Sequence, residues 1–318
     1  MKKLLFLANP LSGKTEGQKI KGKLISILKN YLPANEYDIV ITELNMQNQL
    51  SHICTDYEKV VAAGGDGTIA NIIQVMVSLG WKQKIGIIPL GTGNDLARSL
   101  GLLKILDNGG LESLVKIILK GKTKQLDILE VNNRYTCINY FGMGSDAGIL
   151  RDFEEIRKDA SNQYLFRWEM GKLVYVFLGL RHLNDKIPPG TEILFRSENN
   201  KEVHKCFDSE IRAIVISNIS SYGGGTCLSS KAQTDDGLFE ITVIKNIKEW
   251  ALLHLARFTG KPVNIICPEI NQFQADRVEI LFPETIFCQA DGEIIEGLSK
   301  TEKKIAIKIK SYVDIIVP

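Results

Sequence analysis

Two glycine-rich segments that contain aspartate lie close together in the sequence, and each follows a short apolar run. Residues 64–68 read Gly-Gly-Asp-Gly-Thr, and residues 91–95 read Gly-Thr-Gly-Asn-Asp. Apolar residues with helical spacing follow both segments, so we expect strand, glycine turn and helix twice in succession. Backbone N–H groups of glycine turns and helix N-termini attract anions. The pattern predicts a phosphate site at the carboxyl ends of two parallel strands.

Asp66 and Asp95 lie in or beside these turns. A carboxylate repels bare phosphate, but it holds Mg²⁺ against phosphate oxygens. The two segments therefore predict a nucleoside triphosphate site with a metal ion. The alternative interpretation is a pair of ordinary strand-to-helix turns.

A third glycine turn follows the first predicted strand. Residues 13–15 read Gly-Lys-Thr, like the end of a Walker A loop, but the position of that motif's first glycine holds Ala8. The motif is therefore incomplete, and we do not interpret it as a Walker A loop. Asn9, Ser12 and Gly13 could still donate hydrogen bonds to a phosphate.

Strands and helices alternate up to residue 120, and the periodicity changes near residue 125. We expect a doubly wound parallel α/β domain at 1–124, completed by a last strand at 311–318. Residues 125–310 are expected to form an antiparallel β-sandwich domain. A helix at 166–183 either belongs to its core or lines an apolar cleft. The strands expected in this domain are a hairpin of 126–131 and 135–141 with an Asn-Asn turn, followed by 191–195, 210–217, 238–244, 277–282, 287–290 and 303–309.

Composition excludes several classes of protein. The net charge of +2 gives no strong field for nucleic acid, so no nucleic-acid partner is expected. Six cysteines without a CxxC pair are typical of free thiols in a reducing cytosol. No uncharged apolar run approaches the roughly 18–20 residues of a membrane span, so contact with lipid would be peripheral, from a cytoplasmic protein. The sequence leaves the oligomeric state open and admits a homodimer.

Two further clusters lie in the second predicted domain. Residues 222–225 read Tyr-Gly-Gly-Gly and precede an Asp-Asp-Gly segment at 235–237, which a tight turn alone would explain. Asp291 and Glu293 flank Gly292 at the end of a predicted strand. Either a plain turn or a reactive carboxylate is consistent with this second cluster.

Taken in order, the motifs at 64–68, 91–98, 235–237 and 291–293 resemble those of bacterial lipid kinases of the diacylglycerol kinase catalytic-domain family. The resemblance covers nearly the whole chain. It implies an ATP-binding α/β domain and a β-sandwich domain with the active site between them. It also implies Mg²⁺-dependent transfer of the ATP γ-phosphate to a hydroxyl of diacylglycerol or a related lipid at the membrane surface.

The resemblance also implies roles for individual residues. Asp66, Asp95 and Asp127 would form the carboxylate network around catalytic Mg²⁺, and Asp291 or, less favoured, Glu293 would be the base. A separate structural Mg²⁺ would be held by the carbonyls of Gln233 and Leu238 and the side chain of Asp236. The residues expected near the ATP phosphates are Asn9, Ser12, Gly13, Thr42, Gly65, Asp66, Gly67, Thr68 and Thr92.

One departure from the family pattern keeps two alternatives open. Residues 69–71 read Ile-Ala-Asn where the family usually has a hydrophobic residue, Asn and Glu. NAD kinases share the Gly-Gly-Asp-Gly turn, but they also carry Asn-Glu after it, and here the only Asn-Glu is at 35–36. A non-catalytic nucleotide or lipid sensor of the same fold is the other alternative. The sequence does not distinguish diacylglycerol from phosphatidylglycerol, a sphingoid base or a prenylated alcohol.

Overall fold

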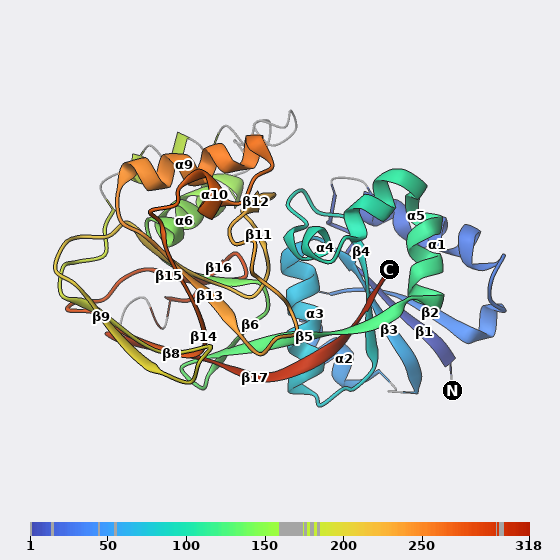
Figure 1. The fold of residues 1–318 in the computed structure, drawn as a ribbon. Helices are drawn as coiled ribbons and strands as arrows, with labels where there is room; N and C mark the ends of the chain where they lie inside the picture. Colours follow the sequence, from blue (N-terminus) through green and yellow to red (C-terminus); the bar gives the residue numbers. More distant parts are fainter. Residues whose placement is uncertain are drawn as a thin grey trace.

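A computed structural model of the chain shows an α/β domain beside a mostly-β domain (Figure 1), which confirms the predicted fold class. Most of the helix predicted at 166–183 lies outside the described residues. Among the residues that the structure describes, no helix is both long and apolar enough to cross a bilayer. The structure describes residues 2–13, 16–43, 45–53, 56–158, 174, 177–178, 181–182, 185–296, 298 and 302–318.

The N-terminal domain is built on four parallel strands in the order β4-β3-β1-β2. Its elements are β1 (Lys2–Ala8), α1 (Glu16–Leu28), the 3₁₀ helix η1 (Ala34–Glu36), β2 (Tyr37–Ile41), α2 (Met46–Ser51), β3 (Tyr57–Gly64), α3 (Asp66–Ser78), β4 (Lys84–Pro89), α4 (Asp95–Ser99) and α5 (Leu102–Lys120). Helices α2 and α3 pack on one face of the sheet, and α1 with the second half of α5 on the other. Because both faces are covered, β3 is apolar at successive residues, as in other parallel sheets.

The second domain is mostly strand, and its sheet surrounds a core of Ile, Val, Leu and Phe side chains. Helices α9 and α10 pack on the outer face of β10 and β13. Neither α6 nor β9 was predicted from the sequence. The elements are β5 (Lys122–Val131), β6 (Tyr135–Cys137), β7 (Tyr140–Gly144), α6 (Ser145–Lys158), β8 (Thr191–Ser197), β9 (Glu202–Phe207), β10 (Ala213–Ser217), β11 (Ser221–Tyr222), β12 (Thr226–Cys227), β13 (Phe239–Ile244), α9 (Ile247–Thr259), α10 (Val263–Ile266), β14 (Asn271–Leu281), β15 (Cys288–Ala290), β16 (Glu293–Ile294) and β17 (Lys304–Val317).

Strand β17 joins the two domains into one large mixed sheet (Figure 1). It pairs antiparallel with β14 and β5, and Ile315 near its end pairs in parallel with Ile85 of β4. The sequence predicted two separate strands in this region, which is wrong. A register shift between Ile309 and Ser311 changes the phase of the side chains while the ladder continues. The division of the chain at residues 124 and 125 stays a prediction.

The predicted hairpin is present, but its second strand is shorter than expected. Asn132 and Asn133 both have positive φ in the turn between β5 and β6. The strand predicted at 135–141 is broken between β6 and β7, at Ile138 and Asn139. The backbone N–H groups of these two residues donate to a carboxylate, that of Asp291, instead of to a neighbouring strand.

Candidate active site

Hydrogen bonds join the loops that follow β1 and β3 at the carboxyl end of the parallel sheet. The side-chain amide of Asn9 donates to Thr68 Oγ1 at 2.7 Å. The backbone N–H of Gly65 donates to Ser12 Oγ at 3.3 Å. Four residues expected at a phosphate site therefore lie together, although they are contributed by two separate strands.

Backbone contacts hold the glycine turns against each other. A Cβ at Gly91 would lie only 2.6 Å from the Cα of Gly65. The Asn94 side chain accepts a hydrogen bond from the Gly91 N–H at 2.9 Å and donates to the Gly91 carbonyl at 2.7 Å. Gly13 has a φ of +61°, and a side chain there would collide with the carbonyl oxygen of Leu90. The loops after β1, β3 and β4 thus depend on glycine for close approach.

Asp66 and Asp95 begin α3 and α4, and their carboxyl groups are electrostatically coupled. Asp66 Oδ1 accepts from the Leu96 N–H at 3.3 Å. Asp95 is buried and accepts from Ser221 Oγ at 2.5 Å and from the Gly224 N–H at 2.8 Å. Burial, and then the negative charge of Asp95, raise the pKa of Asp66 to about 6. A cation between these carboxylates would relieve their repulsion.

The chemistry of this pair is suited to Mg²⁺. Mg²⁺ is commonly held by one or two carboxylates, with substrate phosphates and water completing its shell. In the described parts of the chain, no group of three or more His, Cys, Asp or Glu side chains is arranged as a metal site. Asp66 and Asp95 would therefore bind the ion together with a nucleotide rather than as a preformed protein cage.

Asp127 lies against a different loop from Asp66 and Asp95. Its Oδ2 accepts from the Gly237 N–H at 2.8 Å, and its own N–H donates to the Thr234 carbonyl at 2.7 Å. Burial raises the pKa of Asp127, and the charges of Asp236 and Asp235 add to this effect. Its acidic neighbours are thus those of the loop at 233–238, whereas Asp66 is coupled to Asp95.

The loop at 233–238 contains the residues expected around a structural Mg²⁺. Asp236 Oδ1 accepts from the Leu238 N–H at 3.1 Å, and Gln233 and Asp236 are exposed. Loss of hydration is the main cause that raises the pKa of Asp236. Because the negative charges of Asp236 and Asp235 raise the pKa of Asp127, the loop has an acidic character that a cation would compensate.

Asp291 is buried in the turn between β15 and β16, with a φ of +51°. Its carboxylate accepts backbone N–H groups from Ile138 at 2.8 Å, Asn139 at 2.6 Å and Tyr140 at 3.3 Å. Burial raises the pKa of Asp291 to about 6, although these donors act in the opposite direction. The carboxylate is therefore fixed in orientation and basic enough to accept a proton near neutral pH.

A side chain from α3 reaches Asp291, and sequence reasoning did not single it out. Gln74 Nε2 donates to the Thr136 carbonyl at 3.0 Å and lies 3.4 Å from Asp291 Oδ2. Gln74 follows Gly67 by seven residues, so both lie on one face of α3, about 10 Å apart along its axis. This helical spacing was the available signal, and it links the glycine turn to Asp291.

Three other predicted residues have less direct positions. Glu293 is exposed in β16, and Thr92 is exposed in its loop. Thr42 directly follows β2, and its N–H donates to the Ala8 carbonyl at 3.0 Å. None of these positions by itself assigns a role.

The two halves of the chain match two adjoining family models. The diacylglycerol kinase catalytic domain matches residues 3–131, and the diacylglycerol kinase accessory domain matches residues 136–294. Together the two matches cover most of the chain. The chain therefore belongs to the diacylglycerol kinase family, a family of lipid kinases.

Similar proteins are named as diacylglycerol kinases or as lipid kinases. A diacylglycerol kinase of Bacillus subtilis is 25% identical over 301 residues, which are 92% of this chain and 90% of that protein. A probable YegS-like lipid kinase of Klebsiella pneumoniae is 30% identical over 240 residues, which are 76% of this chain and 72% of that protein. The crystal structure of a putative diacylglycerol kinase from Bacillus anthracis shares the fold with a TM-score of 0.73 and 19% identity, covering 100% of this chain and 95% of that one.

Glycine contacts predict opposite effects on stability for two substitutions in the turns. Gly91→Ala should lower the free energy of unfolding by about 1–3 kcal/mol, because the backbone of Gly65 cannot move away cheaply. Gly67→Ala should be neutral or stabilising by about 0.4–1 kcal/mol, because a Cβ there meets no atom within 4 Å. Urea unfolding of both variants measures the difference. Equal stability of the two variants would contradict this account of the turns.

Proposed function

We propose that this chain is an ATP-dependent lipid kinase that transfers the γ-phosphate to a hydroxyl of diacylglycerol or a related lipid with the help of Mg²⁺. The observation that carries the proposal is the pair of Asp66 and Asp95 at two helix N-termini, beside the glycine turns, with the charge of Asp95 acting on Asp66. Family membership supports the acceptor class. The names of the similar proteins favour a lipid kinase over the alternative of an NAD kinase.

The glycine turns would bind the ATP phosphates, with Asn9, Ser12 and Thr68 fixing the loops that donate to them. Mg²⁺ supplies charge neutralisation on the β- and γ-phosphates when it is bound. Asp66 and Asp95 would be the side chains that hold this ion beside the glycine turns. Because the transition state of phosphoryl transfer is loose, positioning and charge neutralisation account for most of the catalysis.

Asp291 would accept the proton of the lipid hydroxyl. Its three backbone donors fix the carboxylate, and a pKa of about 6 leaves it mainly ionised at neutral pH. Gln74 places this carboxylate next to the helix that begins at Asp66. As the pH falls through about 6, Asp291 becomes protonated and the rate should fall.

The substrate would be taken from a bilayer surface. Helix α9 exposes Leu255 and Phe258, the latter to 82%, and Lys261 follows the helix as an exposed cation. Arg257 of the same helix donates to the Gly223 carbonyl at 3.1 Å, in the loop whose next residue binds Asp95. An apolar, basic face connected to the candidate site supports peripheral membrane association, with a lipid bilayer as the partner.

A kinase assay tests the proposal directly. We expect the wild-type protein to transfer phosphate from labelled ATP to diacylglycerol in mixed vesicles, and Asp66→Asn to be at least about 10²-fold slower, because electrostatic positioning is lost. Thermal unfolding checks that the variant is folded. Near-normal turnover by the variant would contradict the role of Asp66. A folded wild-type protein that binds ATP without turnover on any lipid would favour the sensor alternative, which the Ala70-Asn71 departure supports.

The base is identified by comparing two carboxylate-to-amide substitutions. Asp291→Asn should lower kcat by about 10²–10⁴-fold with ATP affinity nearly unchanged, because a general base is lost. Glu293→Gln is the matched control and should do less, since Glu293 is exposed. Steady-state kinetics at saturating lipid measure both. A larger loss for Glu293→Gln would assign the base to Glu293.

The structural ion is tested through stability. If Gln233, Asp236 and Leu238 bind Mg²⁺, adding the ion at a hundredfold its Kd should stabilise the wild-type protein by about 2.7 kcal/mol. Asp236→Ala should abolish this Mg²⁺-dependent rise in Tm. Asp235→Ala is the matched control, because Asp235 is also exposed but pairs with Lys124 at 3.0 Å. An equal Mg²⁺ response in the wild type and Asp236→Ala would exclude the site.

A further inference from the structure

A chain of buried hydrogen bonds runs through the second domain between the two ends of the candidate site. The hydroxyl of Tyr222 donates to Asp146 Oδ1. Gln289 Nε2 donates to Asp146 Oδ2 at 2.8 Å, and Gln289 Oε1 accepts from the Gly292 N–H at 3.0 Å. Asp146, Tyr222 and Gln289 are each more than nine-tenths buried. In the order Tyr222, Asp146, Gln289 and Gly292, they form what we call the Asp146 chain.

Both ends of the Asp146 chain adjoin residues of the proposed reaction. Tyr222 lies in β11 beside Ser221, whose hydroxyl binds the Asp95 carboxylate. Gly292 directly follows Asp291 in the turn between β15 and β16. The Asp146 chain therefore links the loop that binds Asp95 to the turn that contains Asp291.

The glycine at position 142 is explained by this chain. Gly142 lies in β7 opposite Gln289 of β15. A Cβ at Gly142 would overlap Asp146 Oδ2 and come within 2.6 Å of Gln289 Nε2. The hydrogen bond between Asp146 and Gln289 thus crosses directly over a strand residue without a side chain. Only glycine leaves room for it.

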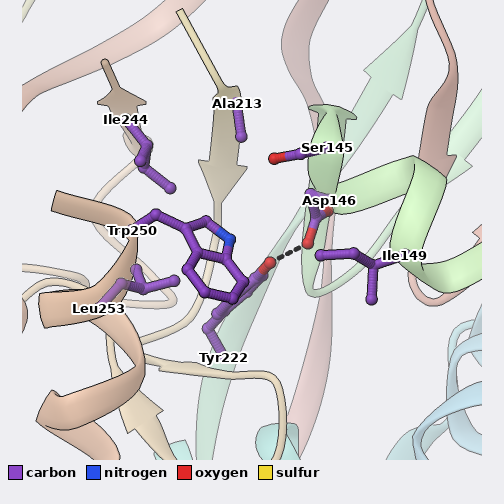
Figure 2. Close-up of a pocket in the computed structure, with 8 residues that line it drawn as sticks. All are labelled: Ser145, Asp146, Ile149, Ala213, Tyr222, Ile244, Trp250 and Leu253. Atoms are coloured by element: carbon purple, nitrogen blue, oxygen red, sulfur yellow. Dashed lines mark hydrogen bonds between the residues drawn. The ribbon is translucent and has the colours of Figure 1, made fainter. Parts of the chain in front are cut away.

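The surroundings make these hydrogen bonds hard to replace with water. Figure 2 shows the Tyr222–Asp146 hydrogen bond beside the ring of Trp250, among side chains from two helices and neighbouring strands. The adjoining cavity has a volume of about 10 Å³, room for at most one water molecule. A polar group of the chain that loses its partner would therefore stay unsatisfied.

We propose that Asp146, Tyr222 and Gln289 are positioning residues. They fix the loop that binds Asp95 and the turn that contains Asp291 relative to each other during phosphoryl transfer. This inference rests on the proposed function. None of these three side chains is needed to touch a substrate. Each side chain has a defined role as donor or acceptor. Asp146 accepts two hydrogen bonds, and Gln289 accepts from the Gly292 N–H through its oxygen.

The test exchanges the hydrogen-bond donor and acceptor between positions 146 and 289. Asp146→Asn should lower kcat about tenfold to hundredfold with KM for ATP little changed, because the amide replaces one of the two oxygens that accept from Tyr222 and Gln289 with a donor. Gln289→Glu alone should also be impaired, because two carboxylates would meet. The double variant Asp146→Asn with Gln289→Glu restores the hydrogen bond between positions 146 and 289 with donor and acceptor exchanged, and it keeps an oxygen to accept from Tyr222 and another to accept from Gly292. It should recover most of the lost kcat.

A pH profile distinguishes positioning from support of the fold. The double variant moves a carboxylate from position 146 to position 289, two residues from Asp291. This should raise the pKa of Asp291, so the acid limb of kcat should move to higher pH. Cys137 is the titratable group that faces Asp291, with its Sγ 3.6 Å from Oδ1, and it is unchanged in the variant. Restored stability without restored kcat would overturn the proposal.

Amide hydrogen exchange at Gly292 tests the chain without any activity. Asp146→Asn should accelerate this exchange about tenfold, and the double variant should reverse the change. The matched control is Asp152→Asn, because Asp152 lies on the same helix with the same 6% exposure and bonds to His182 instead. It should leave both kcat and Gly292 exchange unchanged. Inactive wild-type protein would overturn the proposed function alone, whereas unchanged exchange in Asp146→Asn would overturn this inference.

Discussion

The candidate site depends on buried carboxylates whose hydrogen-bond donors lie far away in the sequence. Asp95 belongs to the α/β domain, yet its carboxylate is bound by Ser221 and Gly224 of the second domain. Asp291 sits on a late hairpin and is bound by residues 138–140. An ionised carboxylate cannot be buried without such donors except at high cost. The hydrogen bonds to Asp95 therefore join the two domains and, at the same time, position a carboxylate of the candidate site.

The acidic residues of the candidate site lie in two separate groups. Asp66 and Asp95 share the glycine turns, whereas Asp127 and Asp236 share the loop at 233–238. Within each group the negative charges raise the cost of ionisation, so each group favours a cation. For Asp291, by contrast, burial is the cause that raises the pKa.

Local chemistry was predictable from the sequence, and distant pairings were not. The glycine turns and the parallel α/β domain follow from apolar periodicity and from the conformational freedom of glycine, and both appear as expected. The association of Asp127 with Gly237 could not be predicted, because its partner lies 110 residues away and has no periodic signal. The break at Ile138 has the same origin, since a strand pattern does not reveal that a carboxylate will take its N–H group. Gln74 was not predicted as a site residue, because a polar residue on a helix is ordinarily expected to face solvent.

The shared strand β17 has a consequence for the order in which the protein can mature. During synthesis β17 emerges after every other described element, and β4 lacks this neighbour until then. The α/β domain can collapse early, since β1 to β4 and their helices are consecutive in the chain. Its sheet edge, however, stays open to other pairings until residues 304–317 arrive. A nascent chain would thus be most exposed to incorrect strand pairing just before its final strand is added.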